Sequence, residues 1–487
     1  MANEEKVMEF LLLNFLKFIK SNPNGINPLV QVGYPNRDIE ANLEDDVLKG
    51  YNPGKNLRDF YDVEGDNLKL KRGARFWIDC GNGNSFLFEV DFPALKNTNS
   101  HYFIKKGGKE TLAGILVQTP QKPQDALEVK AASRWGGGQI QAERTYHEML
   151  SGLYNTKEFL YHLSAKGSSE NDLDNFLEND LSIRSLTYNA NIPPRVNAVF
   201  FSVKCPNGTL DDKVIAKHKF DDITIDYSQL EAQLDKAFIQ NNKRKNGTIF
   251  LNGVKYKDEI EHSIKYSQNR GIHLISIITD STAKHRQSVI EKLIPNSTYI
   301  SNEDELGILT GALTVVKYGK KSHINIDGIL EGIRRVREWQ KGTPQNIYVT
   351  LGELGSISLN KEGDLTWVSK YDVSYNRKPN TNGFGDAYAS AASLLEHFNI
   401  QYGFNLDATQ IQKVATAVVA SKVLSTNNEV SCDVVESLMK NNQPVYSHLG
   451  KVTYKEDENK NGRASLNEMN FGNLKLVFDY FYSHTFL

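Results

Sequence analysis

The chain has 487 residues, of which 39% are hydrophobic and 24% charged, enough for a large buried core in two or three domains or one large α/β domain with insertions. Its 57 basic and 59 acidic side chains nearly cancel, and no basic stripe of the kind that nucleic-acid-binding proteins carry is visible. Three distant cysteines, without a Cys-x-x-Cys pair, give no sign of a zinc or redox site and fit a reducing compartment.

The first predicted element is an amphipathic helix over residues 8–19, which we expect to dock on the body of the protein or on a partner. Asn14 and Lys17 interrupt its apolar residues, so it is too polar for a membrane span of ~20 residues, and its acidic start does not fit a signal peptide. No later stretch is long enough to span a bilayer, and we expect a cytoplasmic protein that uses neither membrane nor nucleic acid. Residues 21–66 are rich in turn-forming residues, so 1–70 is assigned to an N-terminal extension.

The next segment predicts short strands and then a helix. Residues 76–78 are taken as the first buried strand, followed by strands at 86–90 and 111–118 and a helix over 139–153. None of these strands is long enough to fix the architecture by itself.

From about residue 195 the chain alternates between short apolar strands and longer helices. Strands are predicted at 196–203, 248–251, 273–278, 298–300, 347–350 and 356–359. Helices are predicted at 229–238, 258–269, 285–293, from 303, 326–340, 386–398 and 408–424. This alternation is typical of a parallel sheet covered by helices on both faces. Ligands bind such sheets beyond the carboxyl ends of the strands, so the residues at those ends are the candidates for a site.

The strongest motif is Asn-Thr-Asn-Gly-Phe-Gly-Asp at residues 380–386, directly before a predicted helix. Glycines let the backbone approach a ligand closely, and the first amides of a helix attract an anion. Asp386 beside such an anion site would be placed to take the proton from an acceptor hydroxyl. Alone, the motif fits equally a glycine turn with an acid at a helix N-terminus.

Three weaker motifs lie at other strand ends. Residues 302–305, Asn-Glu-Asp-Glu, fit either water-bridged Mg²⁺ or an acidic, capped helix start. Residues 349–356 run from a strand into a turn with glycines three apart, which fits nucleotide phosphates or ribose, or an ordinary tight turn. Residues 135–141 hold three glycines before a helix, which permit the approach of a small ligand or make a flexible connection.

Taken together and in this order, the four motifs resemble those of the ribokinase-like (phosphofructokinase-B type) carbohydrate kinases, over about residues 75–440. The last signature of that family, Asp-Thr-x-Gly-Ala-Gly-Asp, is similar to residues 380–386. Asn302 and Glu305 resemble the family's Asn-x-x-Glu. Thr350, Gly352 and Gly355 resemble its Thr-x-Gly-x-x-Gly. Gly136 and Gly137 resemble its early Gly-Gly element.

The resemblance implies a fold and a division of the chain. The fold is a three-layer α/β/α sandwich with a central, mostly parallel sheet and a small β lid over the substrate. The kinase domain would span 71–440, with the lid from about 86–134 and 195–219, and residues 441–487 would form a C-terminal extension.

The resemblance also implies roles for the matched residues. Asp386 would be the catalytic base, and the amides of Gly383, Phe384 and Gly385 would form the anion hole. Asn302 and Glu305 would organise Mg²⁺. The nucleotide would lie near Thr350, Gly352, Gly355 and Asn428, and the acceptor near Asn84, Gly136, Gly137 and Gln141.

The chain departs from the family pattern mainly where a sugar would be bound. Asn380 replaces the usual Asp, Gln141 replaces the usual Asn, and Phe86 falls where a sugar-binding Asp is expected. The phosphate-transfer residues match better, so the implied function is an ATP-dependent, Mg²⁺-requiring transfer of the γ-phosphate to a hydroxyl of a sugar, sugar phosphate or nucleoside. The family also allows a monovalent cation and a homodimer.

Two alternatives stay open. One is an ADP-dependent sugar kinase of the same superfamily, against which the turn at 350–355 argues. The other is a catalytically silent, nucleotide-binding pseudokinase or scaffold, which Phe86 and Gln141 favour and Asp386 and Glu305 disfavour.

Overall fold

The structure is a computed structural model that describes most of the chain. The described residues are 26–64, 67–81, 85–90, 101–104, 112–150, 156–167, 170, 172–190, 196–205, 208–218, 227–240, 243–244, 246–254, 257–318, 321–340, 342–373, 383–425, 429–441, 444–456 and 462–467. The helix predicted at 8–19 lies outside them, as do the candidates Asn84 and Asn428. Among the described helices, none is long and apolar enough to cross a membrane.

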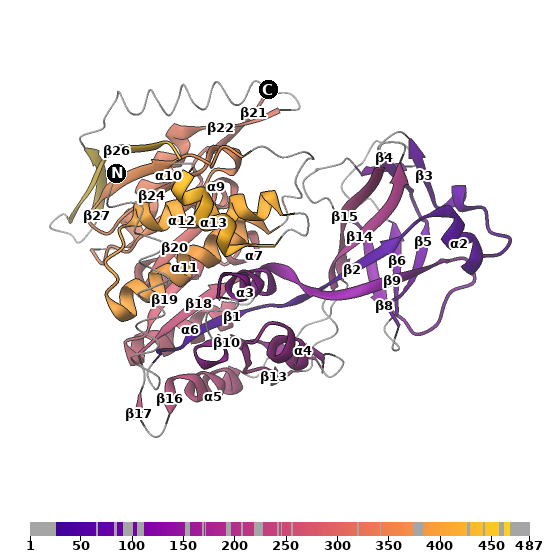
Figure 1. The fold of residues 1–487 in the computed structure, drawn as a ribbon, viewed down its shortest axis with the longest axis horizontal. Coiled ribbons are helices and arrows are strands. Elements are labelled where there is room, and N and C mark those ends of the chain that lie inside the picture. Colours follow the sequence, from indigo (N-terminus) through magenta and orange to yellow (C-terminus); the bar gives the residue numbers. More distant parts are fainter. Residues whose placement is uncertain are drawn as a thin grey trace.

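The described residues form one large sheet of eleven strands at the centre of the main body (Figure 1). Its first seven strands are parallel and its last four antiparallel. In spatial order the strands are β12 (Arg184–Ser185), β10 (Leu160–Leu163), β1 (Leu29–Gly33), β18 (Thr248–Asn252), β19 (His273–Ile277), β20 (Ser297–Asn302), β23 (Ile347–Thr350), β24 (Ser356–Leu359), β25 (Asp364–Val368), β26 (Tyr446–Glu456) and β27 (Gly462–Asn467).

Helices cover both faces of this sheet. One face packs against α5 (Tyr227–Phe238), α6 (Lys257–Arg270), α9 (Glu303–Thr310) and α10 (Ile326–Trp339). The other packs against α3 (Gly137–Leu150), α11 (Phe384–Tyr402), α12 (Ala408–Leu424) and α13 (Cys432–Asn441). Neighbouring strand residues point to opposite layers, as Ile249 and Phe250 of β18 do, because side chains alternate along a strand. The predicted α/β/α architecture is therefore confirmed.

A second body is a closed β-barrel beside the sheet (Figure 1). Its strands are β14 (Val196–Cys205), β15 (Gly208–His218), β8 (Leu112–Gln118), β6 (Ser85–Val90), β5 (Arg75–Asp79), β9 (Leu127–Gly136) and β2 (Asn36–Asn42). Aromatic side chains fill its interior, where the rings of Phe76, Phe88 and Phe201 have centroids 5.5 to 6.2 Å apart. The ranges assigned to the lid supply most of these strands, but β2 and β5 come from outside them.

The structure corrects the predicted ends of the main domain. β1 lies inside the sheet between β10 and β18, and β2 belongs to the barrel, so residues 26–64 are not an extension. The strand predicted at 76–78 is β5 of the barrel, not the first strand of the sheet. At the other end β26 and β27 continue the sheet beyond residue 441. The composition of 21–66 hid β1, because its three large apolar residues, Leu29, Val30 and Val32, barely change the average over such a window.

Candidate active site

The sheet reverses its strand order at β1, since β10 lies on one side of β1 and β18 on the other. Such a reversal is where open α/β sheets bind ligands, at the carboxyl ends of the strands. The carboxyl ends of β1 and β18 meet there, at Gly33 and Asn252. A Cβ atom added to Gly33 would lie 2.0 Å from the carbonyl oxygen of Asn252. The residues around these two strand ends therefore form the candidate active site.

Asp386 lies at this point, in the first turn of α11. A Cβ atom added to Gly138 would lie 2.9 Å from Asp386 Oδ1 and 3.0 Å from Asn252 Oδ1. Asp386 of α11, Gly138 of α3 and Asn252 of β18 therefore lie close together. Gly138 is a glycine because a larger side chain would enter the space between the carboxylate and the amide.

The start of α11 offers backbone donors beside Asp386. Gly383 caps the helix with a φ of 76°, a left-handed conformation that favours glycine, and Phe384 begins the helical turn. Among the residues that the structure describes, a Cβ atom on Gly385 would meet nothing within 4 Å. The first amides of a helix lack intrahelical partners, so this turn has the geometry of an anion site. Gln141 lies close by, with Oε1 3.3 Å from a Cβ on Gly383.

A buried cation adds to the charge around Asp386. Lys422 of α12 is only 2% exposed. Burial lowers the pKa of Lys422, while the negative charges of Glu148 and Asp386 act in the opposite direction. Lys422 therefore lies close enough to Asp386 for the charges of the two side chains to interact.

Two polar residues that the sequence analysis missed face the early glycines. In the antiparallel pairing of β2 with β9, Asn36 lies opposite Gly136. A Cβ atom on Gly136 would lie 2.1 Å from Asp38 Oδ2, and one on Gly137 would lie 2.8 Å from Asn36 Nδ2. Asp38 therefore packs directly against Gly136, and Asn36 against Gly137. The sequence signal for these two residues was a strand-like run that ends at Gly33, followed three residues later by Asn36-x-Asp38.

The floor of the site holds buried acceptors that have no partner within the described residues. Asn252 and Gln139 are fully buried, and neither Asn252 Oδ1 nor Gln139 Oε1 accepts a hydrogen bond there. Their amide nitrogens are used, since Asn252 Nδ2 donates to Gly138 O at 3.1 Å and Gln139 Nε2 to Gln31 O at 3.1 Å. Because buried polar atoms are rarely left unpaired, these oxygens fit the hydroxyl donors of a bound ligand.

The motifs expected to contact metal and nucleotide lie farther along the same edge. Asn302 ends β20 and pairs in register with Thr350, which ends β23. Strands in a sheet are about 4.8 Å apart, so β20 lies about 10 Å from β18 and its Asn252. This spacing allows one extended ligand to reach from the acceptor side to the nucleotide side.

Asn302 and Glu305 form the capping box of α9, one of the two readings that the sequence left open. Asn302 Oδ1 accepts from Glu305 N at 2.8 Å, and Glu305 Oε2 accepts from Asn302 N at 3.0 Å. The first turn of α9 also carries Glu303 and Asp304. Mg²⁺ in proteins commonly keeps several waters and uses one or two carboxylates, so this all-oxygen donor set fits a water-bridged Mg²⁺.

The two glycines of the turn after β23 differ in what surrounds them. Gly352 has a φ of 56°, and a Cβ atom there would meet nothing within 4 Å. Gly355 has a φ of 91°, and a Cβ atom there would lie 2.1 Å from the carbonyl oxygen of Val368. Gly352 therefore borders open space, where a ligand could lie, whereas Gly355 is required by the backbone of β25.

This difference predicts unequal costs of substitution. Gly355→Ala combines a left-handed φ with a backbone clash, and we expect it to lower the free energy of unfolding by about 3 kcal/mol or more. Gly352→Ala has only the left-handed φ and should cost about 1 kcal/mol. Urea unfolding of both variants checks this, and equal costs would show that the close contact with Val368 is wrong.

Comparisons with known proteins give structural likenesses only. No protein-family model and no curated protein matches the chain. A ribokinase from Giardia lamblia is 12% identical with a TM-score of 0.49, covering 85% of this chain and 99% of its own. An Arabidopsis thaliana ribokinase bound to ribose and ATP is 14% identical with a TM-score of 0.46, covering 85% of this chain and 99% of its own. Phosphofructokinase-2 from Escherichia coli, with substrates and products, is 12% identical with a TM-score of 0.47, covering 85% of this chain and 98% of its own.

These solved structures are kinases of the group that the four motifs resemble. At such low identities and TM-scores, however, neither the substrate nor the phosphoryl donor of this chain can be transferred from them. The function has to be argued from the chain's own residues.

Proposed function

We propose that this protein is an ATP-dependent kinase that transfers the γ-phosphate to a hydroxyl group of a sugar, sugar phosphate or nucleoside. The observation that carries the proposal is the meeting of Asp386 with Gly138 and Asn252, at the start of a helix whose first amides have no intrahelical partners. This arrangement combines a base, a place for the acceptor and an anion site, which are the parts that phosphoryl transfer needs.

In this proposal Asp386 accepts the proton of the acceptor hydroxyl as the hydroxyl oxygen attacks the γ-phosphorus. The bond between the γ-phosphorus and its bridging oxygen breaks, and ADP leaves. The amides of Gly383, Phe384 and Gly385 stabilise the charge on the transferring group. Mg²⁺ held through water by Asn302 and Glu305 would neutralise phosphate charge, and Thr350 and Gly352 would line the nucleotide.

The acceptor side favours a ligand with several hydroxyl groups. Asn252 Oδ1 and Gln139 Oε1 are buried acceptors without a hydrogen bond among the described residues, and the Asp38 carboxylate lies against Gly136. Each such oxygen can accept from a hydroxyl, and a polyol supplies hydroxyls at neighbouring carbons. Gly136, Gly137 and Gln141 line the same space. Asn36 and Asp38 join the acceptor residues predicted from the sequence, of which Asn84 lies outside the described residues.

Asp38→Asn tests the acceptor side separately from the chemistry. A hydrogen bond to a charged group contributes about 1.5–3 kcal/mol, so we expect kcat/KM for the acceptor to fall about 10- to 100-fold. The KM for ATP should stay the same, because Asp38 lies on the barrel side of the site. Steady-state kinetics with each substrate varied in turn measures this. An unchanged acceptor KM together with a raised ATP KM would contradict the assignment.

A further inference from the structure

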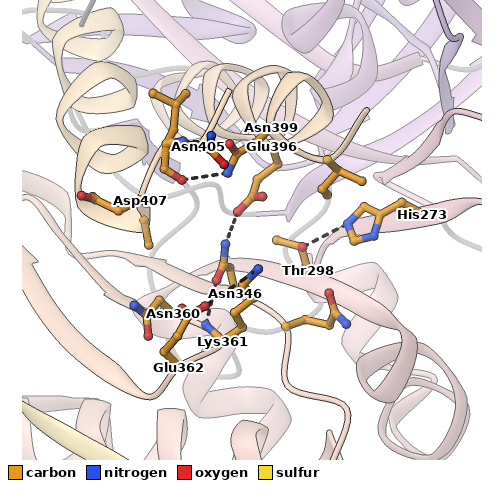
Figure 2. A pocket seen from close by; sticks show the side chains of 14 residues that line it. His273, Thr298, Asn346, Asn360, Lys361, Glu362, Glu396, Asn399, Asn405 and Asp407 are labelled. Atoms are coloured by element: carbon orange, nitrogen blue, oxygen red, sulfur yellow. Dashed lines mark hydrogen bonds and ion pairs between the residues drawn. The ribbon is translucent and has the colours of Figure 1, made fainter. Parts of the chain in front are cut away.

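A second cavity lies at the opposite edge of the sheet, where the parallel strands begin. It has a volume of about 620 Å³, within the range of small-ligand sites. His273 begins β19, Thr298 lies near the start of β20, and Asn346 directly precedes β23. Figure 2 shows that Glu396 of α11 reaches into this space from the helical layer. Nothing in the proposed kinase reaction uses these groups.

Three asparagines in the cavity wall already form hydrogen bonds with neighbouring residues. Asn346 donates to Glu396 Oε1 at 2.6 Å and accepts from Lys361 N at 2.9 Å. Asn360 exchanges two hydrogen bonds with Asp364, and Asn399 exchanges two with Leu406. These amides shape the cavity, and each already uses both its oxygen and its nitrogen.

The charged groups in the lining are mainly carboxylates. Glu396 is 2% exposed, and both hydrogen bonds that it accepts within the described part of the chain, from Asn346 and Tyr348, end on Oε1. Glu362 and Asp407 are exposed at the rim. Among the described residues of the lining, Lys361 supplies one ammonium group, which is exposed and lies 3.8 Å from Glu362. Three carboxylates therefore face one cation.

His273, which also lines the cavity, does not change this balance of charge. Burial lowers the pKa of His273 to about 4, so its ring is neutral at pH 7, and Nε2 lies 3.3 Å from Thr298 Oγ1. Burial raises the pKa of Glu396, against the hydrogen bonds from Asn346 and Tyr348 and the charge of Lys361. The raised pKa favours the neutral form of Glu396, and a bound cation with its own N–H donors would favour the ionised form.

We propose that this cavity is a second ligand site, which binds a small organic cation with amino groups at more than one position, of the polyamine class. One amine would reach Glu396 Oε2 at the floor, and a second would lie between Glu362 and Asp407 at the rim. An anion would meet three carboxylates, and a neutral polyol would leave their charges uncompensated, so both fit less well.

The site is independent of the proposed active site, although α11 connects them. Asp386 lies in the first turn of α11, and Glu396 follows ten residues later, about 15 Å along the helix axis. A cation bound at Glu396 therefore does not touch the nucleotide or the acceptor.

Isothermal titration of the full chain with spermidine, at about 0.15 M salt to screen weak surface binding, tests the proposal. We expect one spermidine per chain, no binding of the neutral 1,4-butanediol, and affinity lowered about 10- to 100-fold in Glu396→Gln. That variant keeps an oxygen for Asn346 and Tyr348. Glu291→Gln, which removes an equal charge at an exposed position outside the cavity lining, and Asp386→Asn should bind as the wild type does.

A second variant keeps the test decisive if Glu396→Gln fails to fold. Ile400 lines the cavity and is 43% exposed, so Ile400→Arg should be tolerated and should place the chain's own cation at the rim. We expect this variant to bind spermidine at least about tenfold more weakly. Absence of binding to the wild type, equal binding of butanediol, or full affinity in Ile400→Arg would each overturn the proposal.

Discussion

Asp386→Asn should lower kcat by about 10²- to 10⁴-fold, the range that a general base contributes. The asparagine keeps the size of the side chain but cannot accept the proton of the acceptor hydroxyl. Because the anion site is made of backbone amides at the start of α11, nucleotide binding should persist. Steady-state turnover and a nucleotide-binding titration of the same preparation measure both properties.

A matched control separates loss of the base from disturbance of the helix. Ser390→Ala removes a hydroxyl that donates to the carbonyl oxygen of Asp386 and leaves the carboxylate in place. It should keep turnover within about threefold of the wild type. If Asp386→Asn turns over as fast as Ser390→Ala, Asp386 is not the base.

Gly138→Ala should be nearly as damaging, although it adds only one methyl group. That carbon would lie 2.9 Å from Asp386 Oδ1 and 3.0 Å from Asn252 Oδ1, closer than carbon and oxygen normally approach. The methyl group must displace the carboxylate or occupy the place of the acceptor hydroxyl, and a misplacement of about 1 Å can cost about 100-fold in rate. We therefore expect kcat/KM to fall at least about 100-fold, measured at low acceptor concentration.

Gly50→Ala is the control for this substitution. Gly50 also lies in a helix, α2 (Asp45–Tyr51), and a Cβ atom there would meet nothing within 4 Å. Alanine should stabilise that helix by up to about 1 kcal/mol and leave the kinetics unchanged. Wild-type activity in Gly138→Ala would show that the glycine element and Asp386 do not meet in solution as they do in the structure.

Most helices between residues 227 and 424, and the strands β18, β19, β20, β23 and β24, were predictable from the sequence, whereas β25, β26 and β27 were not predicted. The helix predicted at 408–424 has those bounds in α12, whose first turn is fixed by a capping box between Asp407 and Gln410. Its apolar residues bury against α11, so local preference and packing agree there.

The barrel could not be predicted in the same way. Its closure depends on β14 pairing with β2, whose paired residues Val199 and Ile39 lie far apart in the sequence. Local patterns show that a segment is extended but not which strand it joins. The same limit hid Asp38, because its place beside Gly136 follows from the pairing of β2 with β9.

Among the candidate site residues, the structure brings Asp386, Gly383 and Gln141 to one place, and Asn302 beside Thr350. These residues follow strand ends or begin helices, positions that a sequence pattern reveals. Asn252 was missed because an amide side chain at the end of an apolar run looks like any turn residue, and Gln139 because nothing distinguishes it from other polar residues at a helix start. Their unpaired buried oxygens are visible only once the fold is formed.

The most direct test of the proposed kinase is nucleotide consumption by the purified chain with ATP and Mg²⁺, against a panel of sugars, sugar phosphates and nucleosides. Parallel reactions with ADP as donor separate the two kinds of kinase that the sequence left open. We predict turnover that needs one class of acceptor, prefers ATP, and disappears in Asp386→Asn. Nucleotide binding without turnover for any acceptor and either donor would contradict the account and favour a silent nucleotide-binding protein.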